Sequence, residues 1–194
     1  MLPLPLILGS SSPFRKELLS RLQLPFETFS PDIDESHIDG ESPEQLVERL
    51  SIEKATEVAH HFPAHLIIGS DQVALNGTEI LGKPGSFENA FQQLAAASGK
   101  SVHFLTGVTL LNSESGKSQT EVVPFTVHFR ELDDNMIKRY LHAEEPYNCA
   151  GSFKSEGLGI SLFKRLEGDD PSALMGLPLI RLVRMLEQQG ATVP

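Results

Sequence analysis

Residues 4–19 read LPLILGSSSPFRKELL, and this stretch decides how the fold begins. Its first half is a short apolar run that ends at Gly9, which predicts a buried strand. Ser12 then stands where a helix N-cap belongs, and Pro13 suits the first helical position. Phe14 and the leucines that follow it share one helical stripe. The stretch therefore predicts a strand, a serine-rich turn and an amphipathic helix.

The same turn also carries groups that suit an anion. Hydroxyls, free amides at the start of a helix and the cations Arg15 and Lys16 all fall between residues 10 and 16. A capped helix on the protein surface would have the same residues. The turn is therefore a candidate phosphate site that needs support from elsewhere in the chain.

The rest of the chain alternates between helical and strand patterns. Residues 42–45 have capping-box spacing and predict a helix that Pro63 stops. Residues 66–75 predict a strand, and Asn76-Gly77 predicts a hairpin in which residues 80–81 return. Further expected elements are a strand from residue 27, a helix over 86–98, strands over 101–112, 120–130 and 160–163, and helices over 133–142 and 178–189. The order predicts an α/β fold with a mixed sheet and flanking helices, as one domain over residues 1–194 with two lobes around a central cleft.

Composition narrows the classes of partner. The 194 residues include 40% hydrophobic and 22% charged residues and have a net charge of −10, so we expect no nucleic-acid partner, and a phosphate ligand would need a focused basic pocket. The single cysteine, Cys149, excludes an internal disulfide and a thiolate zinc site. Residues 2–8 lack the layout of a signal peptide, and no apolar run is long enough for a membrane span. We therefore expect a cytoplasmic protein without a membrane partner.

Two apparent motifs carry little weight. Residues 77–83 match the opening of a P-loop, but Pro84 stands where a serine or threonine should hold magnesium, and the interior fits a hairpin strand instead. The histidines at 60, 61 and 65 are separated by Pro63, which breaks the helix that would align them. Neither a P-loop nor a histidine metal site is favoured.

Asp71 is the most informative single residue. It interrupts an apolar strand, where an unpaired carboxylate would cost several kcal/mol. Such a residue binds a metal, pairs with a cation or transfers a proton. Lys54, on the preceding helix, and Lys83, in a turn flanked by glycine and proline, are available partners. A purely structural ion pair for Asp71 and simple solvation of the lysines stay open as alternatives.

Seven short motifs occur in one order along nearly the whole chain. They are Ser10–Leu19, Asp32–Glu35, Glu53–Ala55, Gly69–Val73, Gly82–Pro84, Ala150–Ser152 and Gly176–Pro178. In these motifs and their order the chain resembles the Maf family of nucleoside triphosphate pyrophosphatases, which implies a Maf or inosine triphosphatase-like fold. The resemblance implies cleavage between the α and β phosphates with a divalent cation, Mg²⁺ or Mn²⁺.

The resemblance also implies roles for individual residues. Asp71 matches the proton acceptor, and Glu35 matches the acidic residue associated with metal or water positioning, so both are candidate metal ligands. Lys54 and Lys83 match the lysines of the catalytic cleft. The family's phosphate-contact motif is matched by Ser10, Ser12 and Arg15. Carboxylates for a cation, positive groups for developing charge and a base for water are what triphosphate hydrolysis requires.

Three departures from the dTTP and UTP branch fall at positions tied to base choice. Phe14, Gln72 and Glu156 together resemble the YceF-type branch, the 7-methyl-GTP pyrophosphatases. An aromatic ring suits the positive charge of a 7-methylguanine, and a carboxylate can accept from its N1 and amino donors. Alternatively, Phe14 completes the apolar stripe of the first helix, and Glu156 pairs with Lys154 or Lys164.

The expected function is therefore a metal-dependent pyrophosphatase that removes a modified nucleotide before nucleic acid synthesis. A dTTP, UTP or CTP pyrophosphatase of the same family is the alternative among enzymes. A nucleotide-binding regulator of septum formation is the alternative outside enzymes, because the family name is associated with septum inhibition. The resemblance allows a homodimer, but the sequence periodicity identifies no interface.

Overall fold

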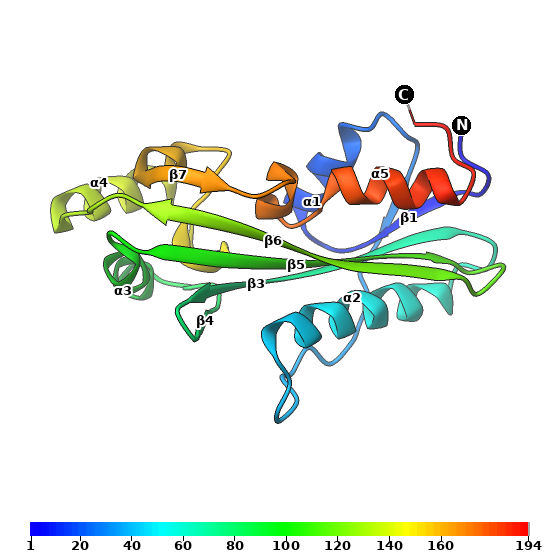
Figure 1. The fold of residues 1–194 in the computed structure, drawn as a ribbon, viewed down its shortest axis with the longest axis horizontal. Helices are drawn as coiled ribbons and strands as arrows, with labels where there is room; N and C mark the ends of the chain where they lie inside the picture. The colour runs from blue at the N-terminus through cyan, green and yellow to red at the C-terminus, as the bar shows by residue number, and fades with distance from the viewer. Residues whose placement is uncertain (194) are drawn as a thin grey trace. The chain divides into compact units, whose positions relative to one another are not determined.

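The computed structural model describes residues 1–193, which form a mixed α/β fold (Figure 1). In chain order, the elements are β1 (Leu6–Gly9), α1 (Pro13–Ser20), β2 (Glu27–Phe29), α2 (Pro43–Ala59), β3 (Leu66–Asn76), β4 (Glu79–Leu81), α3 (Phe87–Ala97), β5 (Ser101–Asn112), β6 (Ser118–Phe129), α4 (Asp134–Glu144), the 3₁₀ turns η1 (Ala150–Ser152) and η2 (Leu158–Leu162), β7 (Phe163–Glu167), the 3₁₀ turn η3 (Pro171–Met175) and α5 (Leu179–Gln188). The predicted fold class, an α/β protein with a mixed sheet and flanking helices, is confirmed.

Seven strands form one sheet within residues 1–193, in the order β2-β1-β3-β5-β6-β7, with β4 paired to β3. Strand β1 pairs in parallel with both β2 and β3, whereas β3 and β4 are antiparallel. The chain divides into two compact units. The first contains residues 1–72, 105–123 and the segment from 170 onward, and the second contains residues 73–104 and 124–169.

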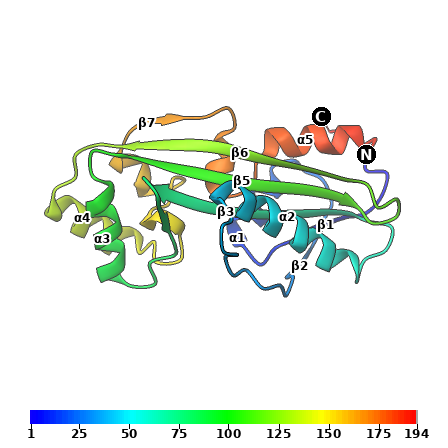
Figure 2. The same ribbon diagram turned by 60° about the horizontal axis from the view of Figure 1, so that its bottom comes forward.

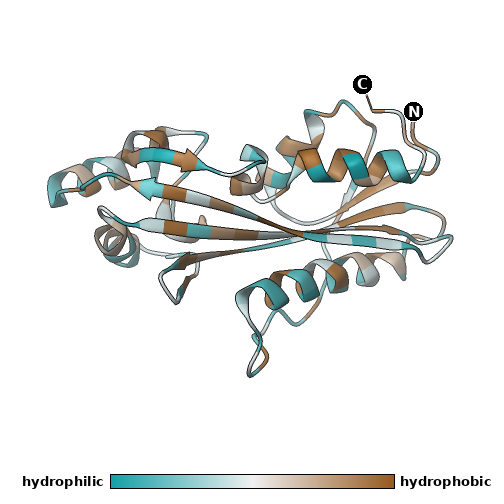
Figure 3. Ribbon diagram, viewed as in Figure 1, coloured by the Kyte–Doolittle hydropathy of each residue, from teal (hydrophilic) through white to brown (hydrophobic). Residues whose placement is uncertain are grey.

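In the first unit, helices cover both faces of the sheet (Figures 1 and 2). On one face, Ile7 and Ile67 of the strands pack with Ala55 and Val58 of α2. On the other face, α1 and α5 complete a larger core with the strands, formed in part by Leu6, Leu8, Leu18, Leu19, Leu182 and Leu186. Figure 3 shows the strands of this core as hydrophobic and α5 as two-sided. The predicted caps hold, since Ser12 caps α1 and Ser42 forms a capping box on α2.

Glycines bring α2 unusually close to the sheet. A Cβ placed on Gly69 of β3 would overlap the Ser51 carbonyl oxygen and lie 2.8 Å from the Ala55 nitrogen. A Cβ on Gly107 of β5 would overlap the Val47 carbonyl oxygen in the same way. The backbone of α2 therefore lies directly on two strands, and this contact sets how far a side chain of α2 must reach to meet β3.

The second unit has its own aromatic core. Phe153 follows η1 and makes edge-to-face contacts with Phe104, Phe129 and Phe163, with ring centroids 4.9–5.6 Å apart. Helix α3 packs against α4 and η1. The loop that contains the Ala150–Ser152 motif is therefore fixed by a buried ring at its end.

One predicted strand was placed incorrectly. The apolar run over residues 160–163 forms the end of η2, and the strand begins only at Phe163. The turn arises because the Gly159 amide donates to the Lys154 carbonyl and the Ser161 hydroxyl to the Leu158 carbonyl. Ile160 is 55% exposed, so the run does not mark a buried strand. Among the helices of residues 1–193, none has the length and apolar character that crossing a membrane requires.

Candidate functional site

Strand β3 presents consecutive residues to opposite faces of the sheet. Ile67 and Gly69 face α2, so Asp71 points toward the same helix. Ser70 and Gln72 point the other way, where their side chains hydrogen-bond to backbone carbonyls in the segment 173–176. The parallel partner β1 ends in register at Gly9 opposite Gly69, so Asp71 lies just beyond the carboxyl end of β1.

Lys54 joins the two predicted acidic residues. Its ammonium Nζ lies 2.6 Å from Oδ1 of Asp71 and 2.7 Å from Oε1 of Glu35. Lys54 is 6% exposed and Asp71 8%, so this ion pair is largely removed from water. The side chain of Glu35 is 60% exposed and reaches the pair from the loop before α2. The structure brings these three residues together, whereas Lys83, the fourth residue predicted for the group, belongs to the second unit.

Asp71 and Glu35 carry the type of ligand, a carboxylate oxygen, that a hard divalent cation prefers. Both present an oxygen to the Lys54 ammonium, which occupies the point where they converge, and Mg²⁺ needs only one or two protein carboxylates because it keeps several waters. Within the described residues, no group of three or more histidine, cysteine, aspartate or glutamate side chains could hold a metal. Asp71 and Glu35 together supply two carboxylates, which is fewer than such a group contains.

Arg15 brings a second positive charge to these carboxylates. Its Nε donates to the Gly176 carbonyl at 2.8 Å, and its Nη1 lies 3.5 Å from the Ser10 hydroxyl oxygen. Burial lowers the pKa of the Arg15 guanidinium, and the negative charges of Asp71 and Glu35 act in the opposite direction. Arg15, Ser10 and the acidic pair therefore belong to one electrostatic cluster.

The remaining residues of the serine-rich turn have local partners. The Ser12 hydroxyl caps α1 by accepting from the Arg15 amide, and the Ser12 amide donates to the Ser10 hydroxyl at 3.1 Å. Phe14 is partly buried and is not among the described residues of the core under α1. The turn thus orders the start of α1 while leaving the ring of Phe14 partly accessible.

Gln72 has a structural function that the sequence did not reveal. Its amide nitrogen donates to the Thr106 hydroxyl at 2.8 Å and to the carbonyls of Ala173 and Leu174 at 2.7 and 3.2 Å. Gly176, with φ +99°, ends η3, and its carbonyl accepts from both Arg15 and Ser70. Only the family resemblance indicated the motif Gly176–Pro178. In the structure, the Gly176 carbonyl of this motif joins Arg15 of α1 to Ser70 of β3.

The predicted residues Lys83 and Glu156 belong to the second unit, and both are exposed. Lys83 lies in the turn after β4. In the same turn, the Gly85 amide donates to the Tyr147 carbonyl. Lys154 pairs with Glu144 at 3.2 Å. Burial raises the pKa of Cys149; the charge of Glu156 raises it further, and that of Lys83 opposes the rise. The charges of Lys83 and Glu156 therefore act in opposite directions on the pKa of the same thiol.

Comparison with known sequences gives consistent matches over nearly the whole chain. The family described as "Maf-like protein" matches residues 5–189. A protein of Pseudomonas savastanoi pv. phaseolicola named 7-methyl-GTP pyrophosphatase is 62% identical over 189 residues, which cover 97% of this chain and 98% of the relative. A protein of Pseudomonas aeruginosa with the same name is 62% identical with the same coverage. Among solved structures, the Ham1 protein of Staphylococcus aureus is similar over 64% of this chain and 71% of that one, with 14% identity and a TM-score of 0.44.

Proposed function

Because the chain belongs to the Maf family, we propose that it hydrolyses 7-methyl-GTP to 7-methyl-GMP and pyrophosphate. The observation that carries the proposal is the buried Lys54 ammonium held between Asp71 and Glu35. The names of the near full-length relatives support the substrate. In the cell, the reaction would keep a modified nucleotide out of nucleic acids, and we propose that it takes place in the cytoplasm within one domain over residues 1–194.

In this reaction Asp71 accepts a proton from the attacking water. Its carboxylate lies at the end of β1, beside two cations, and its Oδ1 is already fixed by Lys54. A base that is held in one orientation can deprotonate water as it attacks the α-phosphorus. Lys54 keeps this carboxylate in place and Glu35 adjacent to it.

We propose that Asp71 and Glu35 also hold a divalent cation, Mg²⁺ or Mn²⁺. When bound, such a cation supplies Lewis-acid stabilisation of the phosphate charge. Arg15, Lys54 and Lys83 supply further positive charge to the triphosphate, and the phosphate contacts come from Ser10, Ser12 and Arg15. Because the whole chain has a net charge of −10, these groups are what attracts an anionic substrate.

Base choice is assigned to Phe14, Gln72 and Glu156. The partly exposed ring of Phe14 can stack on the cationic 7-methylguanine, and Glu156 can accept from its two donors on N1 and the amino group. The hydrogen bonds of the Gln72 amide nitrogen support a positioning role through η3. No nucleic acid or membrane partner is proposed, and the homodimer stays a prediction of the family resemblance.

The test is pyrophosphate release across 7-methyl-GTP, GTP, dTTP, UTP and CTP, with Mg²⁺, Mn²⁺ or a chelator. We expect 7-methyl-GTP to have the highest kcat/KM, and Asp71→Asn to lose at least a hundredfold in kcat, because it keeps the shape and removes the base. Glu156→Gln should lower the ratio of kcat/KM for 7-methyl-GTP to kcat/KM for UTP. A preference for dTTP, UTP or CTP would contradict the substrate, and nucleotide binding without turnover would favour a regulator.

A further inference from the structure

We infer that Arg49 is a positioning residue for Glu35, which it holds in place through the loop of residues 30–42. The inference rests on the proposed function, because it concerns how one proposed metal ligand is kept near the other. Arg49 lies on α2, on the same helix as Lys54, and contacts the loop from the helix side. No motif of the chain draws attention to it.

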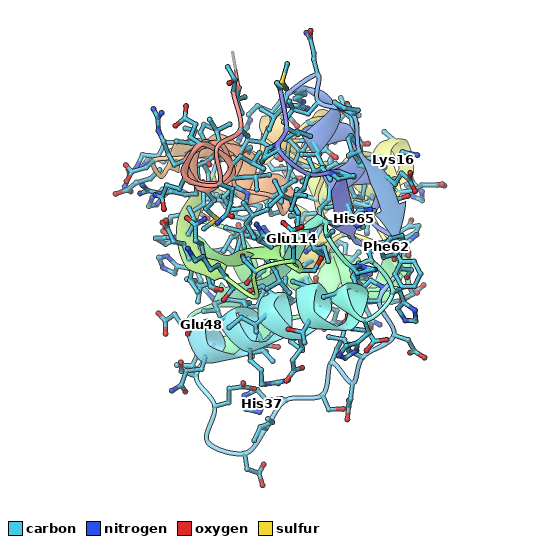
Figure 4. The ribbon with its side chains drawn as sticks, turned by 90° about the vertical axis from the view of Figure 1, so that its right-hand side faces the viewer. Lys16, His37, Glu48, Phe62, His65 and Glu114 are labelled. Atoms are coloured by element: carbon cyan, nitrogen blue, oxygen red, sulfur yellow. The ribbon has the colours of Figure 1, made fainter. Side chains whose placement is uncertain are left out.

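The loop before α2 has few features of its own that would fix it. Residues 30–38 form neither helix nor strand, and residues 34–40 are exposed (Figure 4 labels His37 on this loop, and Glu48 on α2). Its internal bonds are local, such as the Ser36 amide to Asp34 Oδ1 at 2.9 Å and the Glu41 amide to the Ile38 carbonyl at 3.0 Å. A segment of this kind samples many conformations unless side chains from a rigid element hold it.

Arg49 supplies such a hold at both sides of the loop. Its Nε and Nη2 lie 2.7 and 2.9 Å from the two carboxylate oxygens of Glu41, a paired contact that only a guanidinium can make. The same Nη2 donates to the Ser36 carbonyl at 3.0 Å. Ser36 follows Glu35 directly, so this bond fixes the backbone next to the proposed ligand.

The guanidinium is itself fixed from the opposite side. Its Nη1 lies 3.1 Å from Glu53 Oε2, one helical turn further along α2. The hydrogen bonds from Arg49 lower the pKa of the Glu41 carboxyl, so this partner keeps its charge across the neutral range. The side chain of Glu41 is only 8% exposed although its loop is exposed, which marks it as the anchor.

The loop is therefore held to α2 at two points, Arg49 and Lys54. Without Arg49, Glu35 would keep only its contact with Lys54, the very group that also pairs with Asp71. The distance between the carboxylates of Glu35 and Asp71 would then fluctuate more. A cation that needs both carboxylates would bind more weakly. Loss of an outer partner of a metal ligand commonly costs about tenfold or more in metal affinity.

The experiment compares Arg49→Lys and Arg49→Gln with Arg21→Gln, which removes an exposed i,i+4 arginine pair with Glu17 on α1. Two readouts need no turnover: Mn²⁺ binding to the nucleotide-free protein by electron paramagnetic resonance, and hydrogen–deuterium exchange of residues 34–41. The third is the Mg²⁺ concentration for half-maximal pyrophosphate release from 7-methyl-GTP. We expect both Arg49 variants to weaken Mn²⁺ binding about tenfold and to speed exchange in the loop, with a smaller change in kcat. Arg21→Gln should match the unchanged protein in all three.

A Glu41→Gln variant separates positioning from general stability. If Arg49 acts through Glu41, the double variant Arg49→Gln/Glu41→Gln should bind Mn²⁺ about as weakly as either single variant. Independent effects would instead multiply the two losses of affinity. Unchanged Mn²⁺ affinity in both Arg49 variants would overturn the inference. Weakened Mn²⁺ binding in a protein that releases no pyrophosphate even without substitution would support the inference and contradict the proposed function.

Discussion

Lys54 shows how a single cation can organise acidic residues that come from different elements. Asp71 comes from the middle of β3 and Glu35 from a loop, and each lies within 2.7 Å of the same nitrogen. Burial of a carboxylate in this position would be unfavourable without a charged partner. The ammonium therefore stabilises the fold and arranges the proposed catalytic pair with the same contacts.

Replacement of this cation should affect stability and activity together. We expect Lys54→Met to lower the free energy of unfolding at pH 7 by on the order of 3 kcal/mol, because Asp71 stays buried without its partner. Pyrophosphate release should fall about a hundredfold. Urea denaturation and a turnover assay would measure both. Lys164→Met, at an exposed position of β7, is the control and should change stability by less than about 0.5 kcal/mol.

The reactivity of Cys149 reports the charges around it in the second unit. Burial and the Glu156 carboxylate both raise the pKa of the thiol, whereas Lys154 lowers it. Since the thiolate is the reactive form, Glu156→Gln should speed alkylation by iodoacetamide at pH 8 and Lys154→Gln should slow it. The rates can be followed by mass spectrometry of the intact protein. A rate that does not change in Glu156→Gln would mean that this carboxylate does not act on the thiol.

At the scale of elements, the close contact between α2 and the sheet determines where Lys54 can reach. We expect Gly69→Ala to destabilise the protein by about 1–3 kcal/mol, because the added Cβ would overlap the Ser51 carbonyl and push α2 away. The displaced helix should also carry Lys54 away from Asp71 and lower turnover. Thermal unfolding and the pyrophosphate assay test both effects. Ile52→Ala, on the partly exposed side of α2, should leave stability and turnover nearly unchanged.

Helix α3 connects two motifs of the second unit through Gln93. The buried Ser152, with φ +64°, donates its hydroxyl to Gln93 Oε1 at 2.5 Å, and Gln93 Nε2 donates to the Gly82 carbonyl at 3.1 Å. Ser152→Ala and Gln93→Leu should therefore be coupled by about 1 kcal/mol in a double-mutant cycle of unfolding free energies. Additive effects, within about 0.3 kcal/mol, would show that the bond between Ser152 and Gln93 contributes no interaction energy to stability.

The elements also show which parts of the structure can be predicted from sequence. Ser12 and Ser42 were identified as helix starts because capping depends on residues a few positions apart. The strand expected over 160–163 was misplaced because an apolar run does not distinguish a 3₁₀ turn from a strand. The grouping of Asp71, Lys54 and Glu35 followed from a buried charge and the family motifs. The bond from Arg15 to Gly176, 161 residues apart, has no local signal and required the fold.

For the whole molecule, several carboxylates make stability depend on pH. Hydrogen bonds lower the pKa of Asp34, Glu41 and Glu167, chiefly those from Ser36, Arg49 and His128 respectively. A carboxyl whose pKa is lower in the folded state stabilises the protein at any pH above its pKa in the unfolded state. This contribution is lost as the pH falls through the folded-state pKa. The urea midpoint should therefore be constant near neutrality and fall below about pH 4.

Glu41→Gln separates one contribution to this pH dependence. We expect the variant to be less stable than the unchanged protein at pH 7, because a neutral amide binds Arg49 more weakly. The difference should shrink as the pH falls through the lowered pKa of Glu41, because Glu41 then loses its own charge. A difference that stays the same throughout the acid range would assign the effect to packing.

The alternation of side chains along β3 has a consequence for how such proteins can diverge. The side chain of Asp71 contacts α2 and that of Gln72 contacts η3, although the two residues are neighbours in the chain. Mutation can therefore change the residue at 72, which we propose to influence nucleotide preference, while the proposed base at 71 is inherited intact. A single inserted or deleted codon between Gly69 and Gln72 would exchange the two sides at once, so this segment should accept replacements over generations but no change in length.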